Sequence, residues 1–223
     1  MTLDQLVALT VANRWEILAV IFGIISVYLS TREHIWSWPT ALVNVALYFI
    51  VFLEAKLYAD MGLQVVYFAL SLYGWYEWLY GGENRTELHV SRVTRALGLK
   101  LLLIGLASAA LLGTILARLT DASLPYLDSA TTSTSLVAQW MMTRKILENW
   151  AVWAVVDVVY VGMFVFKRLY LTAGLYTVFF VLAVMGQFRM QLDQGHPVGS
   201  QLFPVIGHLQ HLSALFLSVH LHS

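Results

Sequence analysis

Polar and aromatic residues within 57–78 have the spacing that best predicts chemistry. This stretch is largely apolar, yet at i, i+3, i+7, i+11 and i+14 it carries Gln64, Tyr67, Ser71, Trp75 and Trp78. At a helical period these residues share one side, while Leu, Val, Phe and Ala occupy the other. Amides and hydroxyls bind ligands through hydrogen bonds, and indole rings bind them by stacking. We therefore interpret the stretch as one wall of a polar cavity inside a membrane bundle.

A second polar face follows in 149–166, where Asn149, Trp153, Asp157 and Tyr160 recur at i, i+4, i+8 and i+11. An ionisable residue inside a membrane is costly and commonly marks a transport pathway. Asp157 either binds a cationic or hydroxyl-rich ligand, which we favour, or hydrogen-bonds a neighbouring helix. Asp128 lies near the start of its predicted helix, where a role as helix cap is the better explanation.

The neutral amides and the tryptophans leave further alternatives open. Asn44 and Gln64 can hold a carboxamide or sugar hydroxyls, or they can tie neighbouring helices together. Trp75 and Trp153 share faces with polar residues, which favours stacking on a flat or cationic ring. The tryptophans near span ends are expected in an interfacial belt; these are Trp15, Trp36, Trp38, Trp78, Trp140 and Trp150.

Composition indicates an integral membrane protein. The chain is 59% hydrophobic and 12% charged, whereas a soluble domain is roughly 25% charged. Formal net charge is zero, so no nucleic-acid partner is expected. The absence of cysteine excludes disulfides, thiol catalysis and thiolate metal sites.

The hydropathy pattern predicts seven transmembrane helices, each near the ~20 residues that cross a bilayer. The expected spans are 15–30, 36–53, 59–80, 96–119, 125–142, 149–166 and 170–188. The span 125–142 is the least apolar, because Ser and Thr are frequent in it. The expected organisation is an interfacial segment (1–14), a first three-helix bundle (15–80), a loop and connector helix (81–119), a second three-helix bundle (120–190) and a tail (191–223).

An internal repeat relates the two predicted bundles at an offset of 112 residues. The offset aligns identical residues, among them Trp38 with Trp150 and Tyr48 with Tyr160. Because it spans four crossings, the two units are expected to be parallel, giving an all-α architecture of three helices, one connector and three helices. The polar stripe of 57–78 recurs in the second unit with different residue types, because Gln64 aligns with Tyr176 and Trp75 with Gln187. A cavity lined in this way suits an asymmetric small ligand.

Basic residues predict the orientation. Eight lie on the side of the 81–95 loop and five on the other side. The positive-inside rule therefore predicts an extracellular N-terminus and a cytoplasmic C-terminus.

No catalytic or cofactor motif is present. The chain lacks a nucleophile elbow, a Walker A loop, a zinc-protease signature and a glycine-rich dinucleotide loop. The tail histidines have no carboxylate at metal-ligand spacing, so neither metal nor cofactor is expected. Facilitated diffusion is the economical interpretation, with ion coupling left open. A vitamin-binding sensor and a membrane enzyme are the rival classes.

Two runs carry a family resemblance: LVNVALYFIVFLEAKLYADMGLQVVYFALSLYGWYEW and LDSATTSTSLVAQWMMTRKILENWAVWAVVDV. Their motifs, including Y-G-W-Y-x-W at 73–78, M-T-R-K at 142–145 and E-N-W-x-x-W at 148–153, resemble the bacterial PnuC family of nicotinamide riboside transporters. The resemblance covers about 15–190. It implies a bundle similar to the SWEET sugar facilitators, usually homotrimeric, in the bacterial inner membrane. It also implies facilitated import of a riboside that is then trapped by cytoplasmic phosphorylation.

The resemblance also implies ligand contacts. Positions 64, 75, 149, 150 and 153 match the family's motifs, whereas Asp157 stands where Asn is expected and Met190 where Trp is expected. The carboxylate could favour a cationic nicotinamide ring, and it keeps sister families that carry thiamin or riboflavin as alternatives. The candidate substrate-binding residues are Asn44, Gln64, Tyr67, Trp75, Asn149, Trp150, Trp153, Asp157, Tyr176 and Gln187.

Overall fold

The computed structural model describes residues 14–54, 58–120, 124–166 and 170–193. These residues form seven long helices and one short 3-10 helix: α2 (Arg14–Thr31), α3 (Ser37–Glu54), α4 (Tyr58–Tyr80), η1 (Glu83–Arg85), α5 (Arg95–Leu119), α6 (Pro125–Thr143), α7 (Asn149–Phe166) and α8 (Tyr170–Asp193). The only β-type pairing within them is an isolated parallel bridge between Ser91 and Ile146. Apart from Arg14 and 191–193, the predicted N-terminal segment and tail lie outside the described residues.

Five of the described helices are long and apolar enough to cross a membrane, namely α2, α3, α5, α7 and 172–192 of α8. Helix α6 is not among them because its mean hydropathy is too low, as its Ser and Thr content predicted. Helix α4 also falls short, which the sequence analysis did not anticipate, because Asp60, Gln64 and Glu77 lower its mean hydropathy. Helix α8 continues past residue 188, the predicted end of the last span, to Asp193, with Met190 and Gln191 buried.

Local sequence signals explain several helix ends and how α6 tolerates so many hydroxyls. The Thr94 side chain accepts a hydrogen bond from the Leu97 N–H and so caps α5. Pro125 occupies the start of α6, where its missing N–H leaves no helical bond unmade. Within α6 the hydroxyls of Ser129 and Thr134 donate to the carbonyls of Pro125 and Ala130. Self-bonding of this kind lets a hydroxyl-rich helix lie in an apolar environment.

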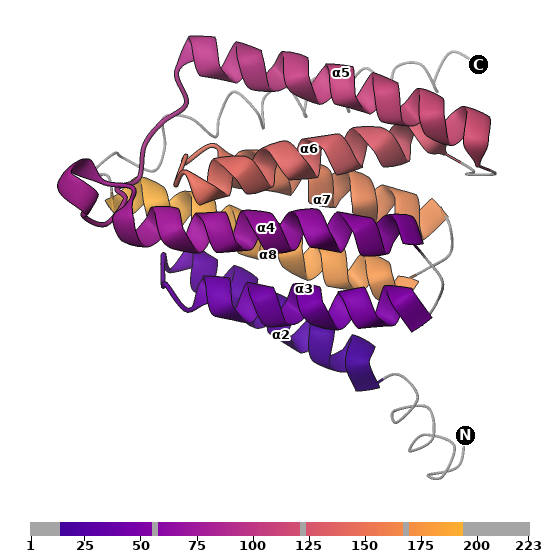
Figure 1. Cartoon of the computed structure of the whole chain (residues 1–223), viewed down its shortest axis with the longest axis horizontal. Helices are drawn as coiled ribbons and strands as arrows, with labels where there is room; N and C mark the ends of the chain where they lie inside the picture. The colour runs from indigo at the N-terminus through magenta and orange to yellow at the C-terminus, as the bar shows by residue number, and fades with distance from the viewer. Residues whose placement is uncertain (1–13, 55–57, 121–123, 167–169, 194–223) are drawn as a thin grey trace, which may run out of the picture.

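Six of the helices form a closed circuit of neighbours. Helix α2 packs on α3, α3 on α4, α4 on α6, α6 on α7, α7 on α8, and α8 returns to α2. Helix α5 packs on α6 at the edge of the bundle, opposite α2 and α3 (Figure 1). The interior of the circuit is therefore where side chains from most helices can meet.

The repeat predicted from the sequence recurs in backbone detail. Shifting α3 by 112 residues reproduces the bounds of α7. The α2–α3 and α6–α7 turns make matching hydrogen bonds, for example His34 N–H to the Leu29 carbonyl and Ile146 N–H to the Met141 carbonyl. Aromatic stacks also repeat: ring centroids are 5.6 Å apart for Tyr48 and Phe52, and 5.8 Å apart for the equivalent Tyr160 and Phe164.

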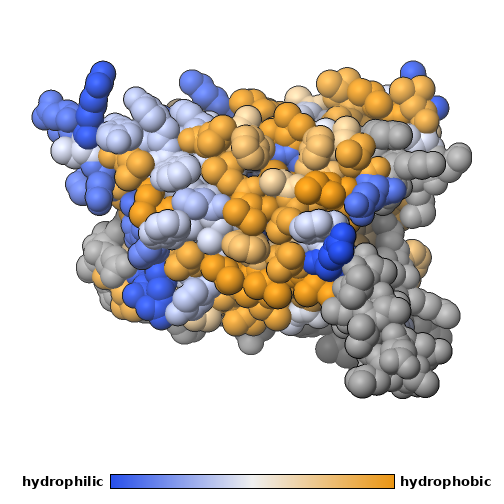
Figure 2. All heavy atoms as spheres, turned by 60° about the horizontal axis from the view of Figure 1, so that its bottom comes forward, coloured by the Kyte–Doolittle hydropathy of each residue, from blue (hydrophilic) through white to orange (hydrophobic). Residues whose placement is uncertain are grey.

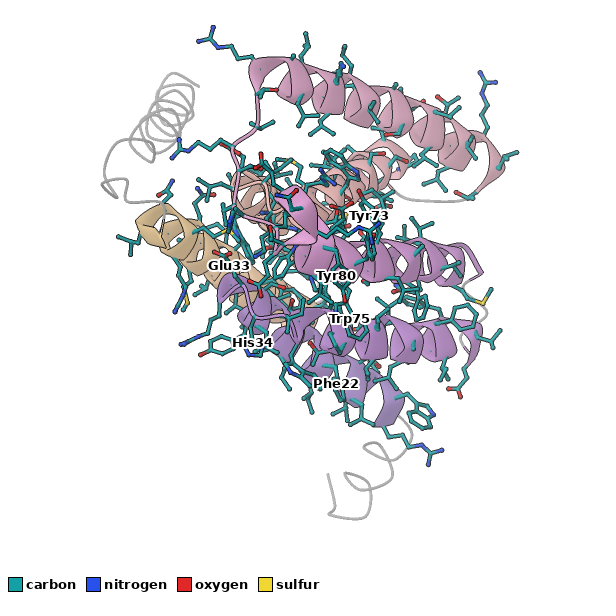
Figure 3. The ribbon with its side chains drawn as sticks, turned by 60° about the vertical axis from the view of Figure 1, so that its left-hand side comes forward. Phe22, Glu33, His34, Tyr73, Trp75 and Tyr80 are labelled. Atoms are coloured by element: carbon teal, nitrogen blue, oxygen red, sulfur yellow. The ribbon has the colours of Figure 1, made fainter. Side chains whose placement is uncertain are left out.

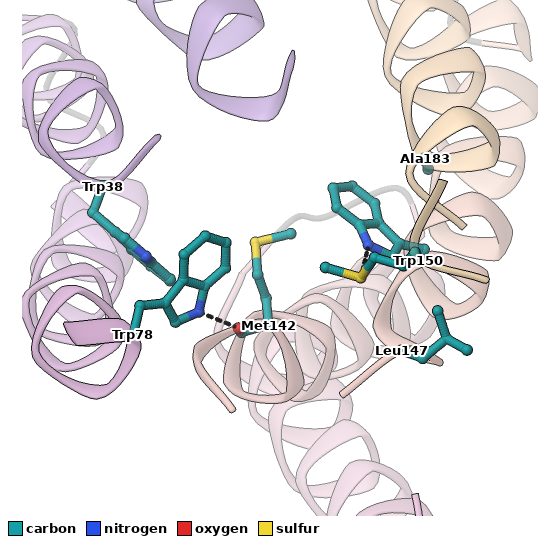
Figure 4. Close-up of a cluster of buried hydrophobic side chains, with 7 residues drawn as sticks. Trp38, Trp78, Met142, Leu147, Trp150 and Ala183 are labelled. Carbon is teal, nitrogen blue, oxygen red and sulfur yellow. Dashed lines mark hydrogen bonds between the residues drawn. The ribbon is translucent and has the colours of Figure 1, made fainter. Parts of the chain in front are cut away.

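The most buried apolar side chains gather near the end of the bundle that holds these turns (Figure 4). Trp38 meets Trp78 edge-on at 5.2 Å, and the Trp78 indole N–H donates to the Met142 carbonyl at 3.0 Å. Trp150 donates to the Met190 sulfur at 3.0 Å. The interfacial belt expected for Trp38, Trp78 and Trp150 is therefore wrong, because their rings are at most 3% exposed.

The outer surface is suited to lipid. Figure 2 shows hydrophobic residues across the middle of one face and the most hydrophilic ones gathered chiefly at one end. Leu99, Leu102 and Leu106 of α5 are 58–59% exposed. An apolar exterior over a polar interior inverts the pattern of a soluble domain and matches a multi-pass membrane protein.

Two close helix contacts depend on glycine at repeat-related positions. A Cβ at Gly74 would collide with the Trp38 ring, and one at Gly186 would lie 2.6 Å from the Trp150 ring. Such overpacking destabilises a core by roughly 1–3 kcal/mol. We therefore expect Gly74→Ala and Gly186→Ala to lower the melting temperature of the detergent-purified protein.

The matched control is Gly162→Ala, because a Cβ there has nothing within 4 Å. This substitution should leave the melting temperature unchanged or raise it slightly, since Ala favours helix over Gly. Equal effects in all three variants would contradict the packing role of Gly74 and Gly186.

Candidate functional site

Four tyrosines and one carboxylate meet inside the circuit of helices. The Tyr176 hydroxyl of α8 lies within electrostatic range of Tyr48 of α3, Tyr67 of α4 and Tyr160 and Asp157 of α7. The Tyr160 and Tyr176 rings are 4.6 Å apart. We call these five residues the tyrosine cluster. Four helices contribute to it, so it exists only once the bundle has assembled.

Aromatic rings and a hydroxyl surround the tyrosine cluster. Phe164 stacks on Tyr176 with ring centroids 5.2 Å apart, and Phe179 meets Tyr176 edge-on at 5.8 Å. Ser135 of α6 lies beside the Tyr67 hydroxyl. The arrangement offers flat apolar faces for stacking together with hydroxyls for hydrogen bonding.

Asp157 is the acidic member of the tyrosine cluster. It is only 4% exposed, and among the described residues its carboxylate has no hydrogen bond or ion pair. Its repeat equivalent in α3 is Val45, which is also buried. A carboxylate where the other repeat has a valine destabilises the fold unless something compensates it. This asymmetry favours the ligand-binding interpretation of Asp157.

Several buried polar atoms in α6, α7 and α8 lack any partner among the described residues. They include the Trp153 indole N–H, the Asn149 side-chain oxygen and the Gln187 side-chain oxygen. Ser133 also leaves a buried hydroxyl oxygen without a partner in the described part of the chain. Buried polar groups are almost always satisfied in folded proteins, so a set of unsatisfied donors and acceptors indicates a place where another molecule binds.

The predicted stripe of α4 lies as expected on the inner side of the bundle. Ser71 and Trp78 are buried, and Gln64, Tyr67 and Trp75 are half-buried. Figure 3 places Trp75 on the side of α4 nearer α3 and Tyr73 on the opposite side. Trp75 also packs against the buried core cluster.

Two predicted contacts, Asn44 and Trp150, have structural partners. The Asn44 amide donates to the Ala19 carbonyl at 2.6 Å, which joins α3 to α2 as the helix-tie interpretation requires. Trp150 lies against Gly186, and its indole N–H donates to the Met190 sulfur. Their roles in ligand binding stay predictions.

Tyr48, Tyr160 and Ser135 were not among the predicted substrate-binding residues, although Tyr160 lies on the predicted polar face of 149–166. A signal for two of them was present, because Tyr48 and Tyr160 are identical at the repeat offset. Ser135 belongs to the predicted span 125–142, which is rich in Ser and Thr, but nothing in the sequence placed it beside Tyr67.

Positive charge is kept away from the tyrosine cluster. The electrostatic neighbours of Tyr67 and Tyr176 are other tyrosines and Asp157. Arg144 and Lys145 instead pair with Glu77 and Glu33, near the end of the bundle. The site can therefore accept a neutral or cationic ligand more readily than an anionic one.

An apolar helical exterior around a buried polar and aromatic site defines a membrane carrier for a small organic molecule. Residues 13–190 match the family model described as nicotinamide mononucleotide transporter. The match covers most of the chain, which therefore belongs to this family and is a transporter, not an enzyme.

Curated relatives and a solved structure agree with this assignment. The chain is 28% identical over 211 residues to the nicotinamide riboside transporter PnuC of Escherichia coli strain K12, covering 83% of this chain and 88% of the relative. It is 29% identical over 145 residues to the riboflavin/roseoflavin transporter RibM of Streptomyces davaonensis, covering 62% and 66%. A crystal structure of the vitamin B3 transporter PnuC has the same fold, with a TM-score of 0.65, 24% identity and coverage of 86% and 88%.

Buried polar groups that serve a ligand destabilise the empty protein. We therefore expect Asp157→Val, which copies the repeat equivalent Val45, to raise the melting temperature of the ligand-free protein. An unpaired buried polar group costs about 1–3 kcal/mol, more when charged. Thermal unfolding in detergent measures the change. A lower melting temperature would mean that Asp157 stabilises the fold, and would favour the helix-tie interpretation.

Proposed function

We propose that this protein transports nicotinamide riboside, a cationic aromatic ring with a carboxamide that is joined to a ribose. The observation that carries the proposal is the set of buried polar atoms of Asn149, Trp153 and Gln187 that have no partner among the described residues, about one to three helical turns along α7 and α8 from the tyrosine cluster. Relatives named as nicotinamide riboside transporters support the same substrate.

Each chemical feature of the riboside has a counterpart in the site. Trp153, Trp75 and Tyr176 offer faces for stacking on the ring, and a cationic ring adds a cation–π attraction of ~1–2 kcal/mol when desolvated. Asp157 balances the positive charge of the ring. The side-chain oxygens of Asn149 and Gln187 accept from the carboxamide N–H groups or ribose hydroxyls. Gln64 supplies a further amide for the ribose.

Transport follows an alternating-access mechanism by facilitated diffusion. We infer two parallel three-helix units, α2–α4 and α6–α8, joined by the connector α5 in a SWEET-like arrangement. The repeated helix bounds and matching turns support this division. Rocking of one unit against the other would expose the central site to each side in turn, as in other carriers built from repeats.

The proposal also covers the membrane, orientation and oligomeric state of the carrier. It lies in the bacterial inner membrane with its N-terminus outside and its C-terminus in the cytoplasm, where phosphorylation traps the riboside. It assembles as a homotrimer. The apolar face of α5 supports such an assembly, since its leucines are exposed and its small residues allow close helix contact.

Riboflavin is the second candidate substrate, because one relative is named a riboflavin/roseoflavin transporter. Its flat ring would also stack in an aromatic site. The riboside is favoured because riboflavin has an uncharged ring that leaves Asp157 uncompensated. Thiamin, which is also cationic, is a third possibility that the same measurement separates.

Calorimetric titration of the detergent-purified protein with nicotinamide riboside, nicotinamide mononucleotide, riboflavin and thiamin tests the substrate. We expect the riboside to bind tightest. The mononucleotide should bind roughly 100-fold more weakly, because its phosphate would be buried without a basic partner. Tighter binding of the mononucleotide would contradict the proposal, and tighter binding of riboflavin or thiamin would replace the substrate while keeping the site.

Substitutions at the amides test the site itself. Gln64→Ala and Asn149→Ala should each weaken riboside binding about tenfold, the effect of losing roughly 1.4 kcal/mol of hydrogen bonding. Asn149 also donates to the Ile146 carbonyl, so melting temperature is measured alongside affinity. Thr40→Val is the control, because the Thr40 hydroxyl bonds only helix carbonyls in its own turn. Unchanged affinity in both alanine variants would remove these amides from the site.

A further inference from the structure

Glu33 and Lys145 occupy the same position in the two repeats. Each follows the helix that opens its unit, and each has a left-handed backbone, with φ of 51° and 47°. This conformation is uncommon outside glycine, so its recurrence shows that the two turns share one geometry. The residue types differ in the one respect that matters for pairing: one is an acid and the other a base.

The two side chains form an ion pair with each other. The Lys145 ammonium lies 3.3 Å from a Glu33 carboxylate oxygen, although 112 residues separate them in sequence. Lys145 is only 8% exposed, and its ammonium lies 4.7 Å from the centre of the Trp78 ring. Figure 3 shows Glu33 near the same end of the bundle as His34 and Tyr80. A charge buried to this degree depends on its partner.

A second set of contacts crosses between α4 and the end of α6. Arg144 pairs with Glu77 at 2.6 Å and donates to the Tyr73 hydroxyl at 3.2 Å. The Trp78 indole N–H donates to the Met142 carbonyl. These contacts and the Glu33–Lys145 pair therefore join α2–α4 to α6–α7 at one end of the bundle.

The segment between α4 and α5 holds the Lys145 turn in place. The Ser91 N–H donates to the Lys145 carbonyl at 3.0 Å, and the Leu147 N–H donates to the Ser91 carbonyl at 2.9 Å. The Val93 N–H donates to the Glu148 carboxylate at 2.9 Å. These hydrogen bonds hold the backbone of the turn that carries Lys145.

We propose that the Glu33–Lys145 pair is a latch that closes this end of the transport site, and that the pair must separate in every transport cycle. The inference rests on the proposed transport function. Two properties suit the pair to this task. Its members belong to different repeats, so relative motion of the repeats separates them. Once apart, both charges are hydrated by the water that enters, which compensates the lost pair.

The absence of native cysteine allows a direct test. The double variant Glu33→Cys, Lys145→Cys is reconstituted in liposomes and treated with a short bis-thiosulfonate cross-linker. Cross-linking should reduce riboside flux at least tenfold, and a reductant should restore it. Riboside affinity in detergent should stay within twofold, because the central site is intact. Mass spectrometry measures the cross-linked fraction.

The matched control is Arg32→Cys, Trp36→Cys, which places both cysteines in the α2–α3 turn of one repeat. Cross-linking this variant should not change flux. Full cross-linking of positions 33 and 145 with unchanged flux would overturn the latch, as would failure of the two cysteines to cross-link. Absence of riboside flux in the untreated wild-type protein would instead contradict the transport function, so the two failures are distinguishable.

A charge exchange gives an independent readout. Lys145→Glu places two carboxylates together and should lower flux, whereas Glu33→Lys combined with Lys145→Glu should restore at least half of it. Restoration is expected because the two turns have the same backbone geometry. A double variant no more active than Lys145→Glu would overturn the pairing.

Discussion

The structure depends on one constraint: polar groups inside a lipid bilayer must find their partners within the protein. Most do so locally, as in α6, where hydroxyls bond carbonyls of their own helix. Others join helices, as Asn44 does when it bonds the Ala19 carbonyl. The groups that remain without partners are therefore informative, and we propose that a transported molecule supplies the missing bonds of those around Trp153 and Gln187.

The repeat explains how such a site arises in a nearly symmetric bundle. Positions that carry the packing are alike in both units: a tryptophan lies on a glycine at Trp38 and Gly74, and again at Trp150 and Gly186. Positions that line the interior differ, as Val45 and Asp157 do. Shared packing maintains the common fold, whereas divergence at the centre gives the two halves of the interior different side chains.

The same division applies to the end of the bundle. The α2–α3 and α6–α7 turns have one backbone geometry, yet Glu33 and Lys145 carry opposite charges and meet across the two units. Trp78 and Met190 also occupy equivalent positions, and the first contacts Trp38 while the second accepts from Trp150. The Glu33–Lys145 contact between the units thus arises where the two copies differ, whereas Trp78 and Met190 each contact the tryptophan of their own unit.

The sequence by itself determined the class of protein, most helix bounds and the repeat. These properties follow from hydropathy and periodicity, which are local along the chain. It also identified Asp157 and the stripe of α4, because polar residues in an apolar helix stand out wherever they lie. Trp38, Trp78 and Trp150 were misplaced, since proximity to a span end does not reveal which way a ring points. Only the tertiary structure brought Tyr48, Tyr67, Tyr160 and Tyr176 together and paired Glu33 with Lys145, because those contacts depend on how distant helices pack.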